Sequence, residues 1–164
     1  MDNVLALLPI IEVDRTVVSR NELLNMSRVT SWWQNSDGYV EFYFQDIADR
    51  KDKATEYKTS LDLHTFETYF DETQPNPFIT INCDKFNPQP IGIVSPGNFR
   101  DFPFSHQRVS INLDWFVKAR ARPSDETGSW VWVTTKGSFN YIVFQTGNTL
   151  EEINTSSSNS GSMP

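Results

Sequence analysis

The sequence predicts a mainly β protein, built from antiparallel meander or sandwich-like sheets with one or two short helices. Aromatic residues are abundant, with five Trp, five Tyr and twelve Phe among 164 residues, and aromatic side chains favour strands. Polar and apolar residues alternate in several short runs, most clearly in residues 39–44, and this period is typical of a half-buried strand. Turn signals that contain glycine separate the runs.

The N-terminal segment predicts an arm or a first strand. Residues 1–11 are apolar, but they are few, they carry no basic flank and they include Pro9. These features argue against a secretory signal and against a membrane span. We therefore expect a protein that acts in the cytoplasm or in an assembled particle.

The first half continues with strands and one helix. Residues 10–18 are rich in β-branched side chains and include a turn signal at Asp14-Arg15. Two strand-like runs flank Asp37-Gly38, and an Asp-Gly turn in that position is a strong hairpin signal. Ser60 is the expected N-cap of a short helix. The expected elements are strands at 29–33, 39–44 and 55–59 and a helix that ends near Phe70.

A segment rich in proline and phenylalanine, residues 74–107, separates the two halves. Its prolines argue against a central strand over most of its length, because proline cannot donate to a strand ladder. Its Phe and Ile content is too high for a disordered linker. We therefore expect an ordered connection that wraps the surface of the domain or reaches a partner.

The second half predicts strands, turns and a short helix in a similar order. Strands are expected at 108–112, 115–122, 129–135 and 138–145, with a helix at 150–153. The Ser-, Asn- and Gly-rich end is typical of a flexible tail. The predicted organisation is a β-rich half (1–73), the connection (74–107), a second β-rich half (108–153) and a polar tail (154–164).

The similar order of signals raises the question of an internal duplication. Aligning Asn21 with Asn112, an offset of 112 − 21 = 91 residues, places Tyr39 on Trp130 and Val40 on Val131. A duplicated β-β-β-α unit would produce this pattern, and so would two unrelated meanders, since strand-rich sequences align easily by chance.

Residue types that carry catalysis or bind metals are scarce. Cys83 is the single cysteine, and it falls in a strand-like run, residues 79–83, that predicts a small buried thiol. His64 and His106 are the only histidines, and no phosphate-loop, zinc-protease or serine-hydrolase motif occurs. We expect no enzyme activity, no cofactor and no metal. A deep pocket that holds Cys83 beside His106 would reverse this expectation.

Alternation along two C-terminal runs divides aliphatic from ring-bearing and basic side chains. Val131 and Val133 are expected in the core, and so is the side of residues 115–121 that carries Trp115, Val117, Ala119 and Ala121. The opposite face is the candidate binding surface. Its residues are Phe116, Lys118, Arg120, Arg122, Trp130 and Trp132, with Tyr39 and Tyr43 as their counterparts in the first half.

Three roles for this face compete. It packs against the proline-rich segment of the same chain, it meets another protein subunit, or it binds single-stranded nucleic acid by stacking bases on its rings. Lys plus Arg number 14 and Asp plus Glu number 21, so the net charge of −7 disfavours the third role. The leading hypothesis is a non-enzymatic structural or assembly subunit that binds other protein subunits in an oligomer, such as a component of a phage or virus particle. The alternative is the nucleic-acid-binding module.

Overall fold

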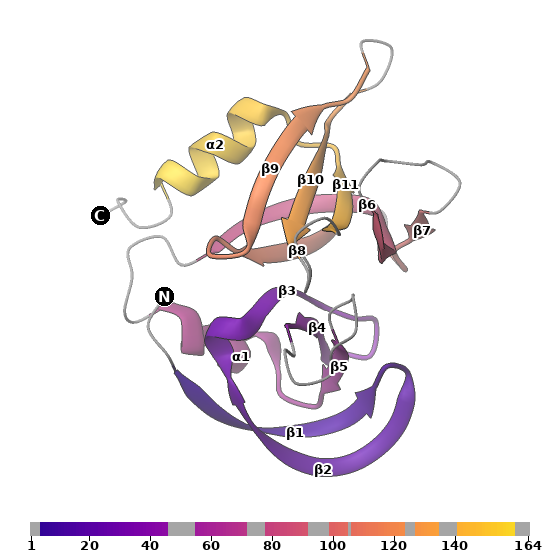
Figure 1. Ribbon diagram of the computed structural model, residues 1–164, viewed down its shortest axis with the longest axis vertical. Coiled ribbons are helices and arrows are strands. Elements are labelled where there is room, and N and C mark those ends of the chain that lie inside the picture. The colour runs from indigo at the N-terminus through magenta and orange to yellow at the C-terminus, as the bar shows by residue number, and fades with distance from the viewer. Residues whose placement is uncertain are drawn as a thin grey trace.

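The computed structural model describes residues 4–45, 55–71, 78–91, 99–104, 106–123, 127–134 and 141–159. In this described part of the chain, 11 strands form one open antiparallel sheet with two short α-helices, which confirms the mainly β class (Figure 1). The strands are β1 (Leu5–Val13), β2 (Thr16–Asn25), β3 (Val29–Gln34), β4 (Val40–Phe44), β5 (Thr55–Thr59), β6 (Phe78–Ile91), β7 (Arg100–Asp101), β8 (Gln107–Asn112), β9 (Phe116–Ala121), β10 (Ser129–Thr134) and β11 (Tyr141–Thr146). The helices are α1 (Leu63–Asp71) and α2 (Leu150–Asn159), and a 3-10 turn, η1 (Met26–Arg28), precedes β3.

The strands lie side by side in the order β2-β1-β5-β4-β3-β8-β6-β11-β10-β9, and β7 pairs with β6 outside this path. β2 and β9 therefore end the sheet, and Figure 1 shows them at opposite ends of the molecule. Both predicted hairpin turns are confirmed. Asp14 and Arg15 adopt positive φ values of 47° and 68° between β1 and β2, and Gly38, at 85°, lies between β3 and β4.

The sheet contains the same arrangement twice. The strands β2-β1-β5-β4-β3 are followed along the chain by α1, and the strands β8-β6-β11-β10-β9 are followed by α2. If the two-residue strand β7, which lies off this path, is left out, the first strand of each half lies between the second and the fifth, and the fifth strand leads into the helix. The repeating unit is thus five strands and a helix, larger than the β-β-β-α unit considered from the sequence. We call β1 to α1 the first repeat and β6 to α2 the second repeat.

The pairing of individual residues repeats as well. Asn25 and Asn112 end equivalent strands, and the Oδ1 of each accepts a hydrogen bond from the backbone N–H two residues later, at 3.1 and 3.0 Å. β3 skips Thr30 where it pairs with β4, and β9 skips Val117 where it pairs with β10. The two repeats therefore share even the position of a β-bulge.

The spacing between the repeats differs from strand to strand. It is 112 − 25 = 87 residues from β2 to β8, 78 − 5 = 73 from β1 to β6, and 132 − 43 = 89 from β4 to β10, as the matching registers require. The sequence alignment at 91 residues is therefore wrong in register. Loops of different length separate the strands, so a single offset cannot align both repeats.

Two hydrophobic cores lie on opposite faces of the sheet, one beneath each helix. Trp32 and Trp33 are neighbours on β3, so they point to opposite faces and belong to different cores. Phe70 of α1 stacks on Trp32 with ring centroids 4.3 Å apart in the first core, and α2 contributes Ile153 to the second core. Val131 and Val133 lie buried in the second core as predicted.

A strand pair between β3 and β8 joins the two repeats, and we call this pair the repeat joint. Trp32 lies opposite Ser110, and Trp33 lies opposite Val109. α1 spans the joint, because Oε2 of Glu67 accepts hydrogen bonds from Nε1 of Trp32 at 2.9 Å and from Oγ of Ser110 at 3.0 Å. The first helix therefore contacts both repeats.

Strand β6 (Phe78–Ile91) occupies part of the segment 74–107, whose prolines argued against a central strand over most of its length. It lies in the middle of the sheet between β8 and β11. Its ladder with β8 ends at Cys83 and its ladder with β7 ends at Phe86. Pro88 and Pro90 come after both, where the strand pairs with β11 alone among the described strands. Proline is tolerated there because this part of β6 has a ladder partner on one side only among the described strands.

The helix boundaries also differ from the sequence-based expectation. Asp62, not Ser60, caps α1, and its Oδ1 accepts from the N–H of Thr65 at 2.8 Å. α2 extends through residues 154–159, which were expected to be tail, while residues 160–164 lie outside the described residues. A reciprocal pair of hydrogen bonds between Thr149 and Glu152, at 3.2 and 2.8 Å, starts this helix.

Candidate interaction surfaces

The structure brings together four of the residues predicted for the binding face. In the ladder between β9 and β10, Trp130 lies opposite Arg120 and Trp132 lies opposite Lys118. Residues directly opposite in an antiparallel pair share a face, so two rings and two cations lie on one side of the sheet. β9 is the end strand among those that the structure describes, so this face borders an open edge of the described sheet.

Trp132 is the centre of this group, but its ring is buried, with an exposed fraction of 2%. The Nζ atom of Lys118 lies 4.9 Å from the ring centroid and the Cζ atom of Arg120 lies 5.3 Å from it. Both distances suit cation–π contacts. The indole N–H of Trp132 has no hydrogen-bond partner among the described residues. The two cations are therefore exposed side chains that lie against an aromatic ring.

Phe116 lies on the other side of the sheet, which corrects its expected place beside Lys118. The bulge at Val117 inserts one extra residue between them, so the alternation predicted for residues 115–122 shifts by one position. Phe116 packs against the second core instead. Local sequence periodicity gives no signal for this bulge.

Arg122 and Trp130 have mainly local partners. Arg122 follows β9, and its Nη1 donates to the carbonyl oxygen of Thr127 at 3.2 Å while its backbone N–H donates to that of Gly128 at 3.0 Å. Nε1 of Trp130 donates to Oε1 of Gln145 at 3.3 Å, and the ring is half-buried. Arg122 therefore links the end of β9 to the residues just before β10.

The two tyrosines predicted as counterparts are separated. Tyr43 lies opposite Glu56 as Trp132 lies opposite Val143, so the pairing makes Tyr43 the counterpart of Trp132. Tyr43 is buried against Trp33, and burial, followed by the charge of Glu56, raises the pKa of its hydroxyl well above the ordinary value. Tyr39 lies exposed in the turn before β4, and its position does not correspond to that of Trp130 or Trp132.

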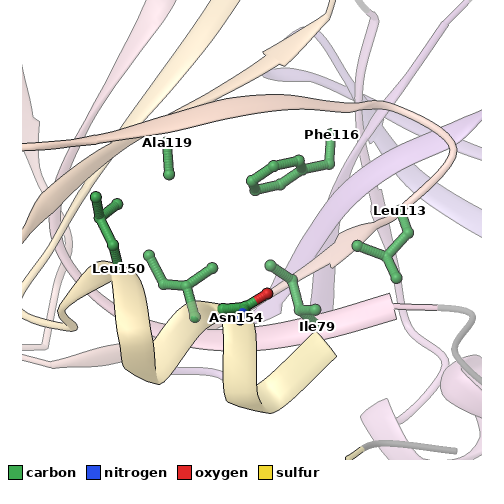
Figure 2. A pocket seen from close by; sticks show the side chains of 7 residues that line it. Ile79, Leu113, Phe116, Ala119, Leu150 and Asn154 are labelled. Atoms are coloured by element: carbon green, nitrogen blue, oxygen red, sulfur yellow. The ribbon is translucent and has the colours of Figure 1, made fainter. Parts of the chain in front are cut away.

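An apolar pocket beneath α2 was missed by the sequence reasoning. Figure 2 shows side chains from α2, β6 and β9 pointing into one space, which has a volume of about 240 Å³. The lining residues are Ile79, Leu113, Phe116, Ala119, Leu150, Ile153 and Asn154. We call this space the α2 pocket. It borders the same open edge as Lys118 and Arg120, on the opposite face of β9.

The other end of the sheet carries a group of exposed leucines. Leu5, Leu7 and Leu23 are 61%, 63% and 63% exposed, and the pairing of Leu7 with Leu23 places all three on one face of the β1–β2 hairpin. We call this group the leucine face. The sequence signal for this face is the continuous apolar run 4–8. A strand with one face in water normally alternates apolar and polar residues, so an unbroken apolar run indicates that both faces of the strand are apolar.

Cys83 and His106 have different environments. Cys83 is fully buried in β6, as the strand-like run 79–83 predicted, and burial raises the pKa of its thiol well above the ordinary value, with a further contribution from Asp84. The His106 side chain is exposed, with its Nδ1 3.9 Å from Oδ1 of Asp84. No group of three or more His, Cys, Asp or Glu side chains suited to a metal ion occurs in the described ranges.

Comparisons with protein-family models, with curated protein sequences and with solved structures give no match for this chain. Among the helices that the structure describes, none has the length and apolar character needed to span a membrane. The β2 end offers exposed leucines, and the β9 end offers an apolar pocket and two cations.

Proposed function

We propose that this protein is a non-enzymatic structural or assembly subunit that binds neighbouring protein chains. The observation that carries the proposal is that both end strands of the described sheet, β2 and β9, are open and lie beside apolar surface. An open edge presents backbone N–H and C=O groups that another strand can pair with. Apolar side chains grouped in water are typical of protein interfaces.

The chemistry of the two ends also suits protein partners. Leu23 lies on the end strand β2, and Leu150 lies at the mouth of the α2 pocket with an exposed fraction of 38%. Arg120 adds a charged group beside the pocket edge, and aromatic residues and Arg are enriched in protein interfaces. These features give an edge contact both apolar area and a means of orientation.

The nucleic-acid alternative has less support. A base must reach the face of an aromatic ring to stack on it, whereas the ring of Trp132 is buried beneath Lys118 and Arg120. We expect no quenching of Trp fluorescence by single-stranded oligonucleotides at low salt. Quenching that weakens as salt is added would favour nucleic-acid binding over our proposal.

Photocross-linking in the cell that makes the protein tests the proposal. A benzophenone amino acid replaces Leu23 in one variant and Leu150 in another, and it replaces Asp37, in the exposed β3–β4 turn, in the control. We expect covalent adducts with protein from the first two positions and none from the third. Absence of adducts from both edge positions in a folded chain would contradict the proposed function.

A further inference from the structure

We infer that the neighbouring chain is a second copy of this protein, bound head to tail, with β9 of one copy paired to β2 of the next. The inference rests on the proposed function and specifies its partner. Its basis is that the molecule already contains this contact once, as the repeat joint between β3 and β8. β9 is the counterpart of β3, and β2 is the counterpart of β8. The two strands left open are therefore the equivalents of the two strands that are joined.

The register of the joint predicts the register between copies. Within the chain, Trp32 lies opposite Ser110. The spacing of 87 residues between the repeats makes Ala119 of β9 the counterpart of Trp32 and Leu23 of β2 the counterpart of Ser110, as the matching ladders require. Leu23 of one copy therefore comes to lie opposite Ala119 of the other, beside the α2 pocket.

Each of the two contacts pairs a large side chain with a small one, but the strand that supplies the large side chain differs. In the repeat joint the large ring comes from β3, as Trp32, and the small partner, Ser110, comes from β8. At the open ends the small residue is on β9, as Ala119, and the large residue, Leu23, is on β2. The α2 pocket is the space left by this exchange, because Ala119 stands where the first repeat has an indole.

A second position supports the same arrangement. Phe78, the first residue of β6, packs across the joint on Trp32 with ring centroids 5.1 Å apart. The matching registers make Leu5 the counterpart of Phe78, because Leu5 lies opposite Asn25 as Phe78 lies opposite Asn112. Leu5 is exposed in the single chain and would be covered by the α2 pocket of the next copy. The leucine face and the pocket are thus matched by position as well as by chemistry.

Charge favours the same register. The counterparts of Trp33 and Val109, which lie opposite each other in the joint, are Arg120 and Glu22. The contact between copies therefore places a guanidinium opposite a carboxylate. Glu22 is partly buried on β2, with Nε of Arg20 3.5 Å from its Oε2. An opposite-charge pair across strands is favourable, and a shifted register would lose it.

The predicted contact is heterologous, because each copy uses a different surface at each end. Such a contact leaves one open end of each kind in a dimer, so association continues into a ring or a filament. This property distinguishes the contact from a two-fold dimer, in which both copies use the same surface.

Sedimentation velocity of the full chain over rising concentration tests the inference. We expect wild type to form species heavier than the 18.9 kDa monomer. Leu23→Glu, which changes the leucine face, and Leu150→Glu, which changes the pocket, are each expected to abolish those species. Val17→Glu is the matched control. Val17 is 81% exposed on the same strand as Leu23 but lies outside the predicted ladder, so this variant should associate like wild type.

Mixing the two blocked variants tests the head-to-tail geometry. Leu23→Glu retains a working β9 end and Leu150→Glu retains a working β2 end, so an equimolar mixture should form one complex of twice the monomer mass and grow no further. Association of either variant alone, with circular dichroism showing an intact fold, would overturn the inference. A two-fold contact uses the same surface in both copies, so only the variant that changes this surface would fail to associate. In a second test, Glu22→Arg and Arg120→Glu should each weaken association, and the double variant should restore it.

The outcomes separate this inference from the proposed function. A wild-type chain that stays monomeric at every concentration overturns self-association. If the photocross-linked adducts then contain only other proteins, the proposed function stands and its partner is a different chain. If no protein adducts form either, the proposed function also fails.

Discussion

Thr59 and Thr146 make the same two hydrogen bonds in the two repeats. The Oγ1 of Thr59 donates to the carbonyl oxygen of Pro9 at 2.7 Å and accepts from the N–H of Leu61 at 3.2 Å. The Oγ1 of Thr146 donates to the carbonyl oxygen of Asn82 and accepts from the N–H of Asn148 at 3.1 Å. Each buried hydroxyl ties the fifth strand of its repeat to the first strand and begins the turn into the helix.

Removing either hydroxyl is expected to destabilise the protein. Thr59→Val and Thr146→Val keep the branched shape but leave buried backbone groups with fewer partners, at a cost of about 1–3 kcal/mol each. Urea unfolding measures the loss. The exposed Thr127→Val is the control and should change the free energy of unfolding by less than about 0.5 kcal/mol. A loss at one threonine only would contradict the equivalence of the two sites.

Glu67 is expected to stabilise the joint between the repeats. Its Oε2 accepts from the indole of Trp32, which is fully buried, and from the hydroxyl of Ser110. Glu67→Ala leaves the indole N–H without this acceptor and should lower the free energy of unfolding by about 1–3 kcal/mol. Glu67→Gln retains an acceptor oxygen and should lose less. Equal losses in the two variants would show that the carboxylate is not acting as the acceptor.

Glu56 is expected to reduce stability at neutral pH. Burial raises the pKa of its carboxyl, opposed by Arg15 and assisted by the nearby acid Glu41. The folded state therefore holds this proton more tightly than the unfolded state, and its stabilising effect is lost as pH rises through the folded-state pKa.

Glu56→Gln should accordingly raise the free energy of unfolding at neutral pH. This gain in the free energy of unfolding should shrink as pH falls and vanish below the ordinary carboxyl pKa of 4.5. Urea unfolding at several pH values measures this trend, with the exposed Asp37→Asn as control. A gain that persists at low pH would indicate an effect of side-chain packing, not of charge.

Lys118 and Arg120 are expected to shield Trp132. Replacing both with alanine removes two cations from the ring and should increase acrylamide quenching of Trp fluorescence, with a stability loss of about 0.5–1 kcal/mol for each cation. The increase in quenching should disappear in a Trp132→Phe background, which assigns it to this ring. Arg108→Ala, an exposed cation on β8, serves as control. Unchanged quenching in the double variant would show that other groups cover the indole.

Much of the secondary structure could be predicted because its signals are local. The turns at Asp14-Arg15 and Asp37-Gly38 depend on residues that accept unusual backbone angles, and both lie where expected. The alternation in β4 placed Val40, Phe42 and Phe44 on one face, and all three lie in the first core. Period-2 patterning records which side of a strand is buried, so it can be read without knowing the neighbouring strands.

The candidate surface could be predicted only in part. Trp130, Trp132, Lys118 and Arg120 share a face as expected, whereas the bulge at Val117 moved Phe116 to the other side. A bulge changes the alternation without changing composition, so no local pattern indicates it. The α2 pocket could not be predicted for a related reason, since its lining residues come from separate parts of the chain.

The sequence by itself determined the strand-forming runs, the tight turns and the buried side of each regular strand, because these follow from propensity and period within a few residues. Tertiary structure alone decided that β6 is central, that β3 joins β8, and that Trp32 and Trp33 serve different cores. Those features depend on pairing between residues far apart in the chain, and many pairings satisfy the same local pattern. Only the packed sheet selects one of them, and with it the two ends left open for a partner.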